Sequence, residues 1–331
     1  MRNGAMDSHR RPRPLAEGVS LIELLVALTI GLVMMVGAVT VYLKARDTYA
    51  ASESTARLQE TARYALNAIE SDLRMANFWG LHNRADFVSA NTASTFPACG
   101  TITNWATDVA NYVAGNNNGY ALSCAASGGG ATSNTDVLIT RHASAVRLSP
   151  QSPTIATPYR THVLVVSSRT AAEIFVPEDL SGAIPTGYAT SDPTGAPPLA
   201  DTRQMTVNAY YVSRDSSVAT GYPALRRKVL IAGPAISDEE VIPGVEDLQF
   251  QIGVDTTGDA NADLFVNPGS VPAGGLPVSV RVWLRIRAQD IDVAHKDTQA
   301  YTYADQSIPA PGDMYRRLLI SKTIQLRNAR P

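Results

Sequence analysis

The 331-residue sequence predicts an α+β fold, in which a long N-terminal helix precedes a mainly antiparallel β-sheet domain. Two observations support this prediction. Apolar residues near the N-terminus first form a continuous run and then recur at every third or fourth position, which is typical of one helix face. Beyond residue 135 they alternate with polar residues, which indicates strands with one covered face.

The composition excludes several classes of function. The formal net charge of −2 provides no basic excess of the kind that nucleic-acid binding requires, so nucleic acid is not an expected partner. The sequence contains no Walker A, HExxH, GxSxG or dinucleotide-binding motif, and we do not expect an enzyme. The five histidines are scattered: His9, His82, His142, His162 and His295.

The first helical segment has the length of a membrane span. Residues 1–18 are polar and basic, and the twenty residues from Leu24 to Leu43 contain neither charge nor proline. At 1.5 Å per residue this run is about 30 Å long, the thickness of a bilayer core. We therefore expect a transmembrane segment at about 21–43. The preceding arginines predict a cytoplasmic N-terminus and a domain on the far side of the membrane.

Three interpretations of this segment differ in what they say about Glu23. A cleaved secretory signal has a shorter apolar core of about 7–15 residues. A plain signal anchor fits the length but leaves the carboxylate unexplained. The third interpretation places a processing site before the apolar run, at Gly18, and gives Glu23 a function. An acid at membrane depth costs about 2.5–3.5 kcal/mol, so it usually marks a specific partner.

The helix is expected to continue over 19–78, with its second half amphipathic and packed against the domain. No proline occurs between Val19 and Phe78, so about sixty residues, or roughly 90 Å, can be helical. The pairs Glu53–Arg57 and Glu70–Arg74 are spaced i,i+4. The predicted buried stripe consists of Leu58, Ala62, Ala65, Leu66, Ile69, Leu73 and Ala76.

Residues 79–331 are predicted to form one β-rich domain. Residues 79–135 are rich in Asn, Ser, Thr and Gly and are expected to be loops. If the domain lies outside the cytoplasm, a Cys99–Cys124 disulfide would stabilise it by roughly 3 kcal/mol. Pro/Gly-rich joints at 183–199 and 267–277 are expected to separate strands rather than domains. Strands are expected at 136–140, 163–166, 173–176, 206–212, 248–254 and 278–287.

The N-terminal residues resemble the type IV prepilins. A short basic leader, Gly18, four residues at 19–22, Glu23 and a long apolar run follow the prepilin pattern in register. The resemblance implies that a prepilin peptidase removes the leader, 1–18, by cutting after Gly18, and then N-methylates Val19. It also implies that Glu23 attracts the free amine of a neighbouring subunit. The sequence departs from the pattern at Val19, where phenylalanine is common, and at Glu17, where a basic residue is commoner. Met6 offers an alternative start that leaves the cleavage site unchanged.

The C-terminal half contains motifs that are similar to those of the PilW group of minor pilins. They are Val245–Phe250, Gly253–Asp255, the strand Val278–Arg287, Tyr315–Arg317 and Thr323–Asn328. The resemblance implies a minor pilin that helps to initiate type IV pilus assembly at or near the tip. It implies a single-pass location in the inner membrane, with a periplasmic domain, and later in the pilus at the cell surface. The implied partners are other minor pilins, the major pilin, the peptidase, the inner-membrane assembly platform and a PilY-type tip adhesin.

Other functions remain open at this stage. The nearest alternative is a J-type minor pseudopilin of a type II secretion system, and a more distant one is a pilus-borne adhesin or DNA-binding subunit. The basic stretches Arg226–Lys228 and Tyr315–Arg317 are expected to be solvated or rim charges on strands.

One acidic loop suggests a calcium site. Its oxygen-bearing side chains alternate as they do in calcium-binding loops: Asp255, Asp259, Asn261 and Asp263. The alternative is an Asx-rich turn between two strands, because Asp, Asn and Gly favour turns. Calcium is the one cofactor that the sequence suggests.

Overall fold

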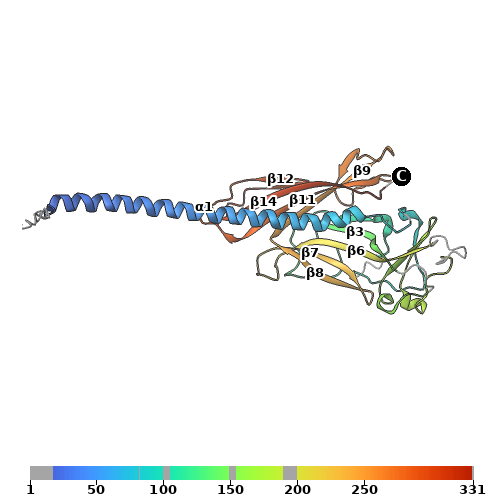
Figure 1. Cartoon of the computed structure of the whole chain (residues 1–331). Helices are drawn as coiled ribbons and strands as arrows, with labels where there is room; N and C mark the ends of the chain where they lie inside the picture. Colours follow the sequence, from blue (N-terminus) through green and yellow to red (C-terminus); the bar gives the residue numbers. More distant parts are fainter. Residues whose placement is uncertain (1–17, 82, 100–104, 149–153, 189–199, 330–331) are drawn as a thin grey trace, which may run out of the picture. The chain divides into compact units, whose positions relative to one another are not determined.

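The computed structural model describes residues 18–329, apart from residues 82, 100–104, 149–153 and 189–199. Of the predicted leader, only Gly18 falls within this range. The chain divides into two compact units, with the boundary between Ser52 and Glu53. The helix α1 (Leu21–Met75), the long blue ribbon of Figure 1, contributes residues to both units.

The predicted long helix is confirmed, with ends slightly inside the expected range of 19–78. At the start, the Glu23 N–H donates to Ser20 Oγ at 3.2 Å, so Ser20 caps the first turn. At the end, Asn77 has a φ of +64°, in the left-handed region that terminates helices. Local capping chemistry therefore sets both ends.

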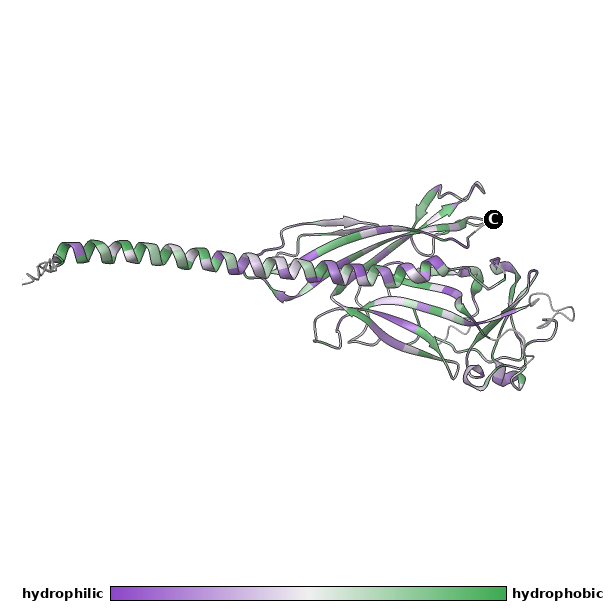
Figure 2. Ribbon diagram, viewed as in Figure 1, coloured by the Kyte–Doolittle hydropathy of each residue, from purple (hydrophilic) through white to green (hydrophobic). Residues whose placement is uncertain are grey.

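The predicted apolar stripe of the second half of α1 is confirmed as the buried face. Ala65, Ile69 and Leu73 are 0 % exposed, and Leu66 is partly buried against the same core. Hydrophobic and hydrophilic side chains share this half of the helix, whereas the first half is mostly hydrophobic (Figure 2). Burial on one side is the arrangement that the spacing of three or four predicts.

The larger sheet has eight strands. Its strands are β1 (Val88–Ala90), β2 (Val113–Asn116), β3 (Val137–Leu148), β4 (Leu164–Ser167), β5 (Ala172–Phe175), β6 (Asp201–Ser213), β7 (Ala224–Ile231) and β8 (Ala235–Pro243). The main path runs β1-β5-β4-β6-β3-β2. Strand β6 is long enough to pair with β4 along its first part and with β7 along its last part, and β8 continues from β7.

The smaller sheet has four antiparallel strands in the order β10-β9-β11-β14. Their bounds are β9 (Val245–Asp255), β10 (Leu264–Val266), β11 (Leu276–Ile291) and β14 (Tyr315–Gln325). A separate hairpin consists of β12 (Tyr301–Tyr303) and β13 (Gln306–Ile308). Short 3-10 helices are η1 (Ala85–Phe87), η2 (Val109–Asn111), η3 (Thr157–Tyr159) and η4 (Pro177–Leu180).

Both sheets pack on the second half of α1, which lies between them in Figure 1. One continuous core contains Ile69 and Leu73 of the helix, Tyr210 of β6 and Val282 of β11. Among the strands that the structure describes, β1 and β5 form the one parallel pair, so the predicted mainly antiparallel α+β fold is confirmed.

Two parts of the domain differ from the sequence expectation. The region 79–135, expected to be loops, also contains β1, β2, η1 and η2. Strand β2 is possible because Gly115 lies against the Val137 carbonyl, where a larger side chain would clash. The hairpin β7–β8 pairs Arg226, Arg227 and Lys228 with three acids at 238–240, so charges stabilise strands that lack clear apolar alternation.

Candidate functional site

The predicted processing site lies in the two residues before α1. Gly18 and Val19 are in irregular backbone, and the Val19 side chain is 69 % exposed. No heavy atom of the described chain lies within 4 Å of a Cβ built on Gly18, apart from its chain neighbours. The segment is therefore open around the bond that the prepilin resemblance implies is cut.

Glu23 lies in the first turn of α1 and is exposed. A carboxylate is favourable there, because the unsatisfied N–H groups give the N-terminus of a helix a partial positive charge. The pattern Ser20-x-x-Glu23 is a capping-box sequence, a signal that the sequence analysis missed. In the part of the chain that the structure describes, no side chain forms a hydrogen bond or ion pair with the Glu23 carboxylate.

The apolar segment that follows is uncovered in its own unit. Val33, Met34 and Met35 are about 70 % exposed, which is the reverse of what a soluble protein does with such residues. Among the described helices, α1 is the one long and apolar enough to cross a membrane. The hydroxyls of Thr29 and Thr40 bond carbonyls of the preceding turn, so they need no water. These features fit a membrane anchor.

Two acids in the second half of α1 bind different sheets. Glu70 accepts a hydrogen bond from Lys322 of β14 at 2.6 Å and pairs with Arg74. Asp72 accepts a hydrogen bond from the Tyr210 hydroxyl of β6 at 2.6 Å, and its carboxylate also binds Asn208. The helix is therefore fixed to both sheets by polar contacts as well as by its apolar stripe.

The surroundings of these acids lower their pKa values. The hydrogen bond from Lys322 is the main reason that the pKa of Glu70 lies below its ordinary value. Burial alone would raise the pKa of Asp72, but the combined effect of His142, Tyr210 and Asn208 lowers it. Both groups are therefore held as carboxylates.

Asn328, near the C-terminal end of the described chain, caps the C-terminus of α1. The Asn328 amide donates to the carbonyls of Arg74, Met75 and Ala76 at 3.2–3.3 Å. Asn77 in turn donates to the Asn328 carbonyl at 3.1 Å. These bonds satisfy carbonyls that the end of a helix leaves unpaired. Residues more than 250 positions apart thus depend on each other, which no local sequence signal reveals.

The structure joins Cys99 and Cys124 in a disulfide, with their Cα atoms 4.6 Å apart. Tyr120, between them in the sequence, donates its hydroxyl to the Cys124 carbonyl at 2.7 Å. Its ring contacts that of Tyr211 edge-on, with centroids 5.1 Å apart. The bridge thus fixes the loop that follows β2 against β6.

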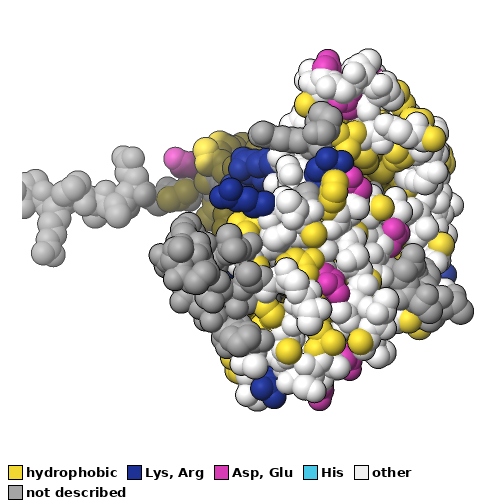
Figure 3. Space-filling model, turned by 90° about the vertical axis from the view of Figure 1, so that its right-hand side faces the viewer, with side chains coloured by type: hydrophobic (Ala, Val, Ile, Leu, Met, Phe, Trp, Pro, Cys, Tyr) yellow, Lys and Arg dark blue, Asp and Glu magenta, His cyan; other side chains and the backbone are white. Residues whose placement is uncertain are grey.

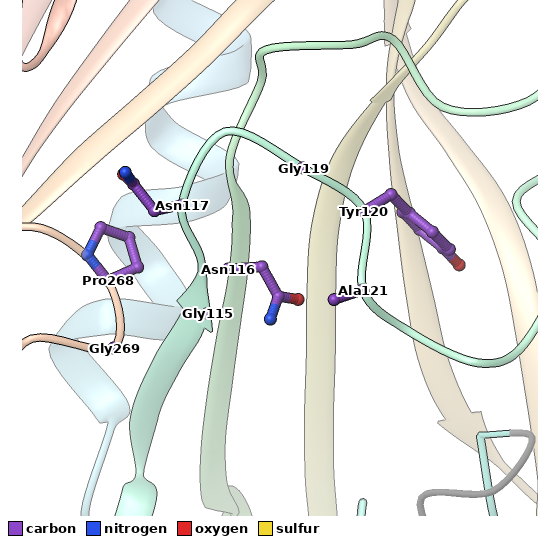
Figure 4. A pocket seen from close by; sticks show the side chains of 8 residues that line it. All are labelled: Gly115, Asn116, Asn117, Gly119, Tyr120, Ala121, Pro268 and Gly269. Atoms are coloured by element: carbon purple, nitrogen blue, oxygen red, sulfur yellow. The ribbon is translucent and has the colours of Figure 1, made fainter.

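A shallow pocket opens beside this loop. Figure 4 shows it between the end of β2 and the β10–β11 connection, lined by Gly115, Asn116, Asn117, Gly119, Tyr120, Ala121, Pro268 and Gly269. Asn117 donates to Asp305 at 2.8 Å, and the Tyr120 hydroxyl is bonded to the backbone. The Asn117 bond holds the loop to the β12–β13 turn, and the Tyr120 bond holds the loop to itself.

The acidic loop forms an Asx-rich turn, the alternative to the calcium hypothesis. Asp255 accepts backbone N–H groups from Thr257, Gly258 and Ala260 at 2.7–2.9 Å. These bonds lower its pKa. Asp263 accepts two bonds from Thr256, both at 2.7 Å. Within the described ranges, no three His, Cys, Asp or Glu side chains group closely enough to hold a metal. Titration of the domain with millimolar calcium tests the hypothesis, which requires a higher melting temperature.

The basic stretches lie on β7 and β14 and are ion-paired. The expectation of solvated or rim charges was wrong for the buried Lys228 and Arg317, whereas Arg227 and Arg316 are partly exposed in ion pairs. Lys228 is 4 % exposed and bonds Asp238 at 2.7 Å. The Arg317 side chain is 3 % exposed and lies between Glu246, Asp297 and Asp313. A carboxylate on the neighbouring strand β8 allows Lys228 to be buried, and acids of β9 and of two connecting loops do the same for Arg317. On the face in Figure 3, most of the visible basic side chains lie in the upper part, and others lie apart from them near the lower and right edges.

The three histidines that the structure describes lie in separate places and do not form a site. His142 of β3 places Nδ1 2.9 Å from the Ala143 carbonyl and Nε2 3.8 Å from Asp72, so it belongs to the contacts of α1. His162 and His295 lie in other loops, and His9 and His82 lie outside the described residues.

The fold defines a class of protein: a single apolar N-terminal helix carries a mainly antiparallel β domain. Residues 209–328, from β6 to the Asn328 cap, match the family model of PilW, described as type IV pilus-assembly protein W. No curated protein and no solved structure matches the chain. The family match supports a PilW-family type IV pilus protein, and the resemblance of the C-terminal motifs is thereby confirmed. PilW is a pilus-assembly family rather than an enzyme family.

Proposed function

We propose that the chain is the precursor of a minor pilin that helps to initiate type IV pilus assembly and enters the pilus at or near its tip. One observation carries the proposal. The prepilin-like register of Gly18 and Glu23 leads directly into an uncovered apolar helix, and the same chain matches a pilus-assembly family. Neither feature alone separates a pilin from an ordinary anchored protein.

The proposed mechanism begins with processing. The peptidase cuts after Gly18 and methylates the new amine of Val19. The helix, with about 21–43 in lipid, keeps the subunit in the inner membrane and its domain in the periplasm. The basic leader supports this orientation.

Assembly would then depend on the carboxylate of Glu23. In lipid, pairing with the amine of a neighbouring subunit offsets the desolvation of both charges. A subunit in the wrong register leaves both charges unpaired, so the pairing selects one position. The exposed carboxylate, without a side-chain partner in the described chain, is available for this role.

The proposed partners act in sequence. The peptidase and the assembly platform bind the subunit while its helix is in the membrane. Other minor pilins, the major pilin and a PilY-type adhesin meet it during assembly. The disulfide and the Glu70 and Asp72 contacts would keep the domain folded outside the cytoplasm.

Mass spectrometry of the tagged full-length chain tests the proposal, with the protein purified from pilus-forming cells and from a peptidase-deficient strain. We expect a methylated N-terminus at Val19 in the first case and an intact leader in the second. Other pilin-type subunits should co-purify with the processed chain. An intact leader in the peptidase-competent strain would contradict the proposal.

Deletion of the gene separates this function from the J-type pseudopilin alternative. We expect loss of pili and twitching with secretion retained. Loss of secretion with normal pili would favour the pseudopilin. An adhesin or DNA-binding role receives less support, because Lys228 and Arg317 are already ion-paired within the domain.

A further inference from the structure

The outer face of the smaller sheet has one covered end and one open end. Along β11, Val280, Val282 and Leu284 face the core and are 0 % exposed. Their neighbours Arg281 and Trp283 face outward and are half-buried. The β12–β13 hairpin covers one end, where the Tyr303 hydroxyl binds Asp247. The other end, around Arg281, has no such cover in the described chain.

Arg281 at this open end is held between aromatic rings without a carboxylate. Its guanidinium carbon lies 4.1 Å from the Phe265 ring centroid and 5.8 Å from that of Trp283. Arg285 and Arg317 on the same sheet both pair with Glu246. Arg281 forms no ion pair within the described ranges. Stacked Arg and Trp side chains are the residues that most often dominate binding at interfaces.

The neighbouring strand β14 is an open sheet edge. It is the last strand in the order β10-β9-β11-β14. The Leu326 N–H donates to the Val278 carbonyl of β11, and peptide groups alternate in direction along an antiparallel strand. The peptide groups of Ser321, Thr323 and Gln325 therefore point away from β11. All three residues are exposed, and in the described structure no backbone hydrogen bond joins them to a further segment.

The stacked arginine and the open edge form one surface. Arg281 is in register with Thr323, and its Nε donates to Thr323 Oγ1 at 3.2 Å. The guanidinium thus leans across β14 toward the edge. A strand added there would lie about 4.8 Å beyond β14 and would place alternate side chains beside Thr323.

The positive charge of Arg281 indicates which kind of chain would bind at this surface. Strand β14 contains Arg316, Arg317 and Lys322 but neither Asp nor Glu. A second copy that paired edge to edge through β14 would therefore bring no carboxylate from that strand to Arg281. An extended segment of a different chain that carries an acidic residue could bond the free peptide groups of β14 and also pair with the guanidinium of Arg281.

We propose that β14 is the docking edge for an extended, acidic segment of a different pilin-type subunit, which adds a strand beside Ser321–Gln325 and places a carboxylate on Arg281. This inference rests on the proposed function, because the partner is a subunit of the same pilus. Main-chain hydrogen bonds supply affinity, and Arg281 with Trp283 supplies selectivity.

The test uses the full-length chain in pilus-forming cells, with a photo-crosslinking residue in place of Gln325. Two variants are designed to weaken binding at this surface. Ser321→Pro removes an outward N–H and leaves the β11–β14 ladder intact, and Arg281→Glu reverses the charge. Ser321→Ala is the matched control for the first, and Arg169→Glu, at an exposed arginine between β4 and β5, is the control for the second. Unfolding midpoints of the purified variants verify folding.

We expect a cross-linked peptide from another pilin-type subunit, with an Asp or Glu within or beside it. Ser321→Pro and Arg281→Glu should each reduce the cross-link about tenfold, corresponding to about 1.4 kcal/mol, and the controls should leave it within about twofold. Replacing the partner's acid by arginine should restore the cross-link to Arg281→Glu.

An undiminished cross-link in either folded variant, a cross-link to a second copy of this chain, or none to protein would overturn the inference. Failure of the proposed function looks different: the leader remains on the chain or deletion leaves the pili intact. Loss of pili on deletion, together with normal cross-linking in both variants, would reject the docking edge alone.

Discussion

Glu23 and Asp72 are acids of the same helix with opposite surroundings. Asp72 is bonded by Tyr210 and Asn208 and lies near His142, so its own domain satisfies it. Glu23 is exposed and has no side-chain partner in the described chain. The first acid contributes to the stability of the fold. The second has the surroundings that the proposed assembly role requires.

The two halves of α1 differ in the same way. Residues around Met34 are apolar on all sides and uncovered, whereas the residues around Ile69 have one buried and one polar side. A helix that is apolar all round suits lipid, and an amphipathic one suits a protein surface. The composition of each half therefore indicates its surroundings before any tertiary contact is known.

The largest contrast is expected from truncating an apolar side chain in each half. Ile69→Ala should lower the free energy of unfolding by about 2–5 kcal/mol, because it leaves a cavity in the core. Met34→Ala, at a position 71 % exposed, should leave it unchanged. Denaturant unfolding of the mature chain in detergent measures both. Similar losses in both variants would show that the first half also packs in the core.

Membrane retention should show the reverse contrast. Met34→Lys places a charge in the apolar run, at a cost of about 3 kcal/mol, and should release protein from the membrane fraction. Tyr64→Lys, at an exposed position of the second half, should be retained like the wild type. Fractionation with carbonate extraction compares the two. Full retention of Met34→Lys would contradict a membrane role for this segment.

The dependence of stability on pH should identify Asp72 as a structural acid. Its native pKa is lowered from an unfolded value of about 3.9, so its contribution is complete above about pH 4 and is lost as the pH falls further. Asp72→Asn should lose about 1–2 kcal/mol at pH 6, and the difference from wild type should shrink toward pH 3. Unfolding midpoints across this range measure it. A constant difference would contradict the account.

A second buried acid should show the opposite slope. Burial raises the pKa of Asp136 to about 7, despite backbone hydrogen bonds from Asn118 and Phe250. The native state therefore binds a proton between about pH 4 and 7 that the unfolded state does not, and stability falls as the pH rises through this range. Asp136→Asn should flatten this slope, which unfolding measurements at pH 5 and pH 8 can detect.

Local patterns predicted much of the fold, but they did not predict the contacts between residues far apart in the sequence. The stripe around Ile69 and the alternation along β11 are periodic, so the sequence revealed them. The β7–β8 hairpin had a weaker signal: Arg226–Lys228 and the acids at 238–240 are mirrored about Gly233, whose φ of +91° suits a turn. The capping-box pattern of Ser20 and Glu23 is also visible in the sequence.

Other contacts of the site had no sequence signal. Asp72 meets Tyr210 across 138 positions, and Asn328 reaches the end of α1 across more than 250. Such pairs depend on the arrangement of whole sheets, which spacing within one segment does not encode. The acidic loop shows that one pattern can fit two roles, because Asp255 accepts backbone N–H groups of its own turn and the calcium hypothesis awaits its titration.

The most direct test compares Glu23→Gln with Asp72→Asn in the full-length chain, by measuring both the unfolding midpoint and the amount incorporated into purified pili. Glu23→Gln should keep the wild-type midpoint and lose most of its incorporation, because it removes the charge that we propose for assembly and that has no side-chain partner in the described chain. Asp72→Asn should lower the midpoint and, at permissive temperature, still be incorporated. Normal incorporation of Glu23→Gln, or a lowered midpoint in that variant, would contradict the division between an assembly acid and a folding acid.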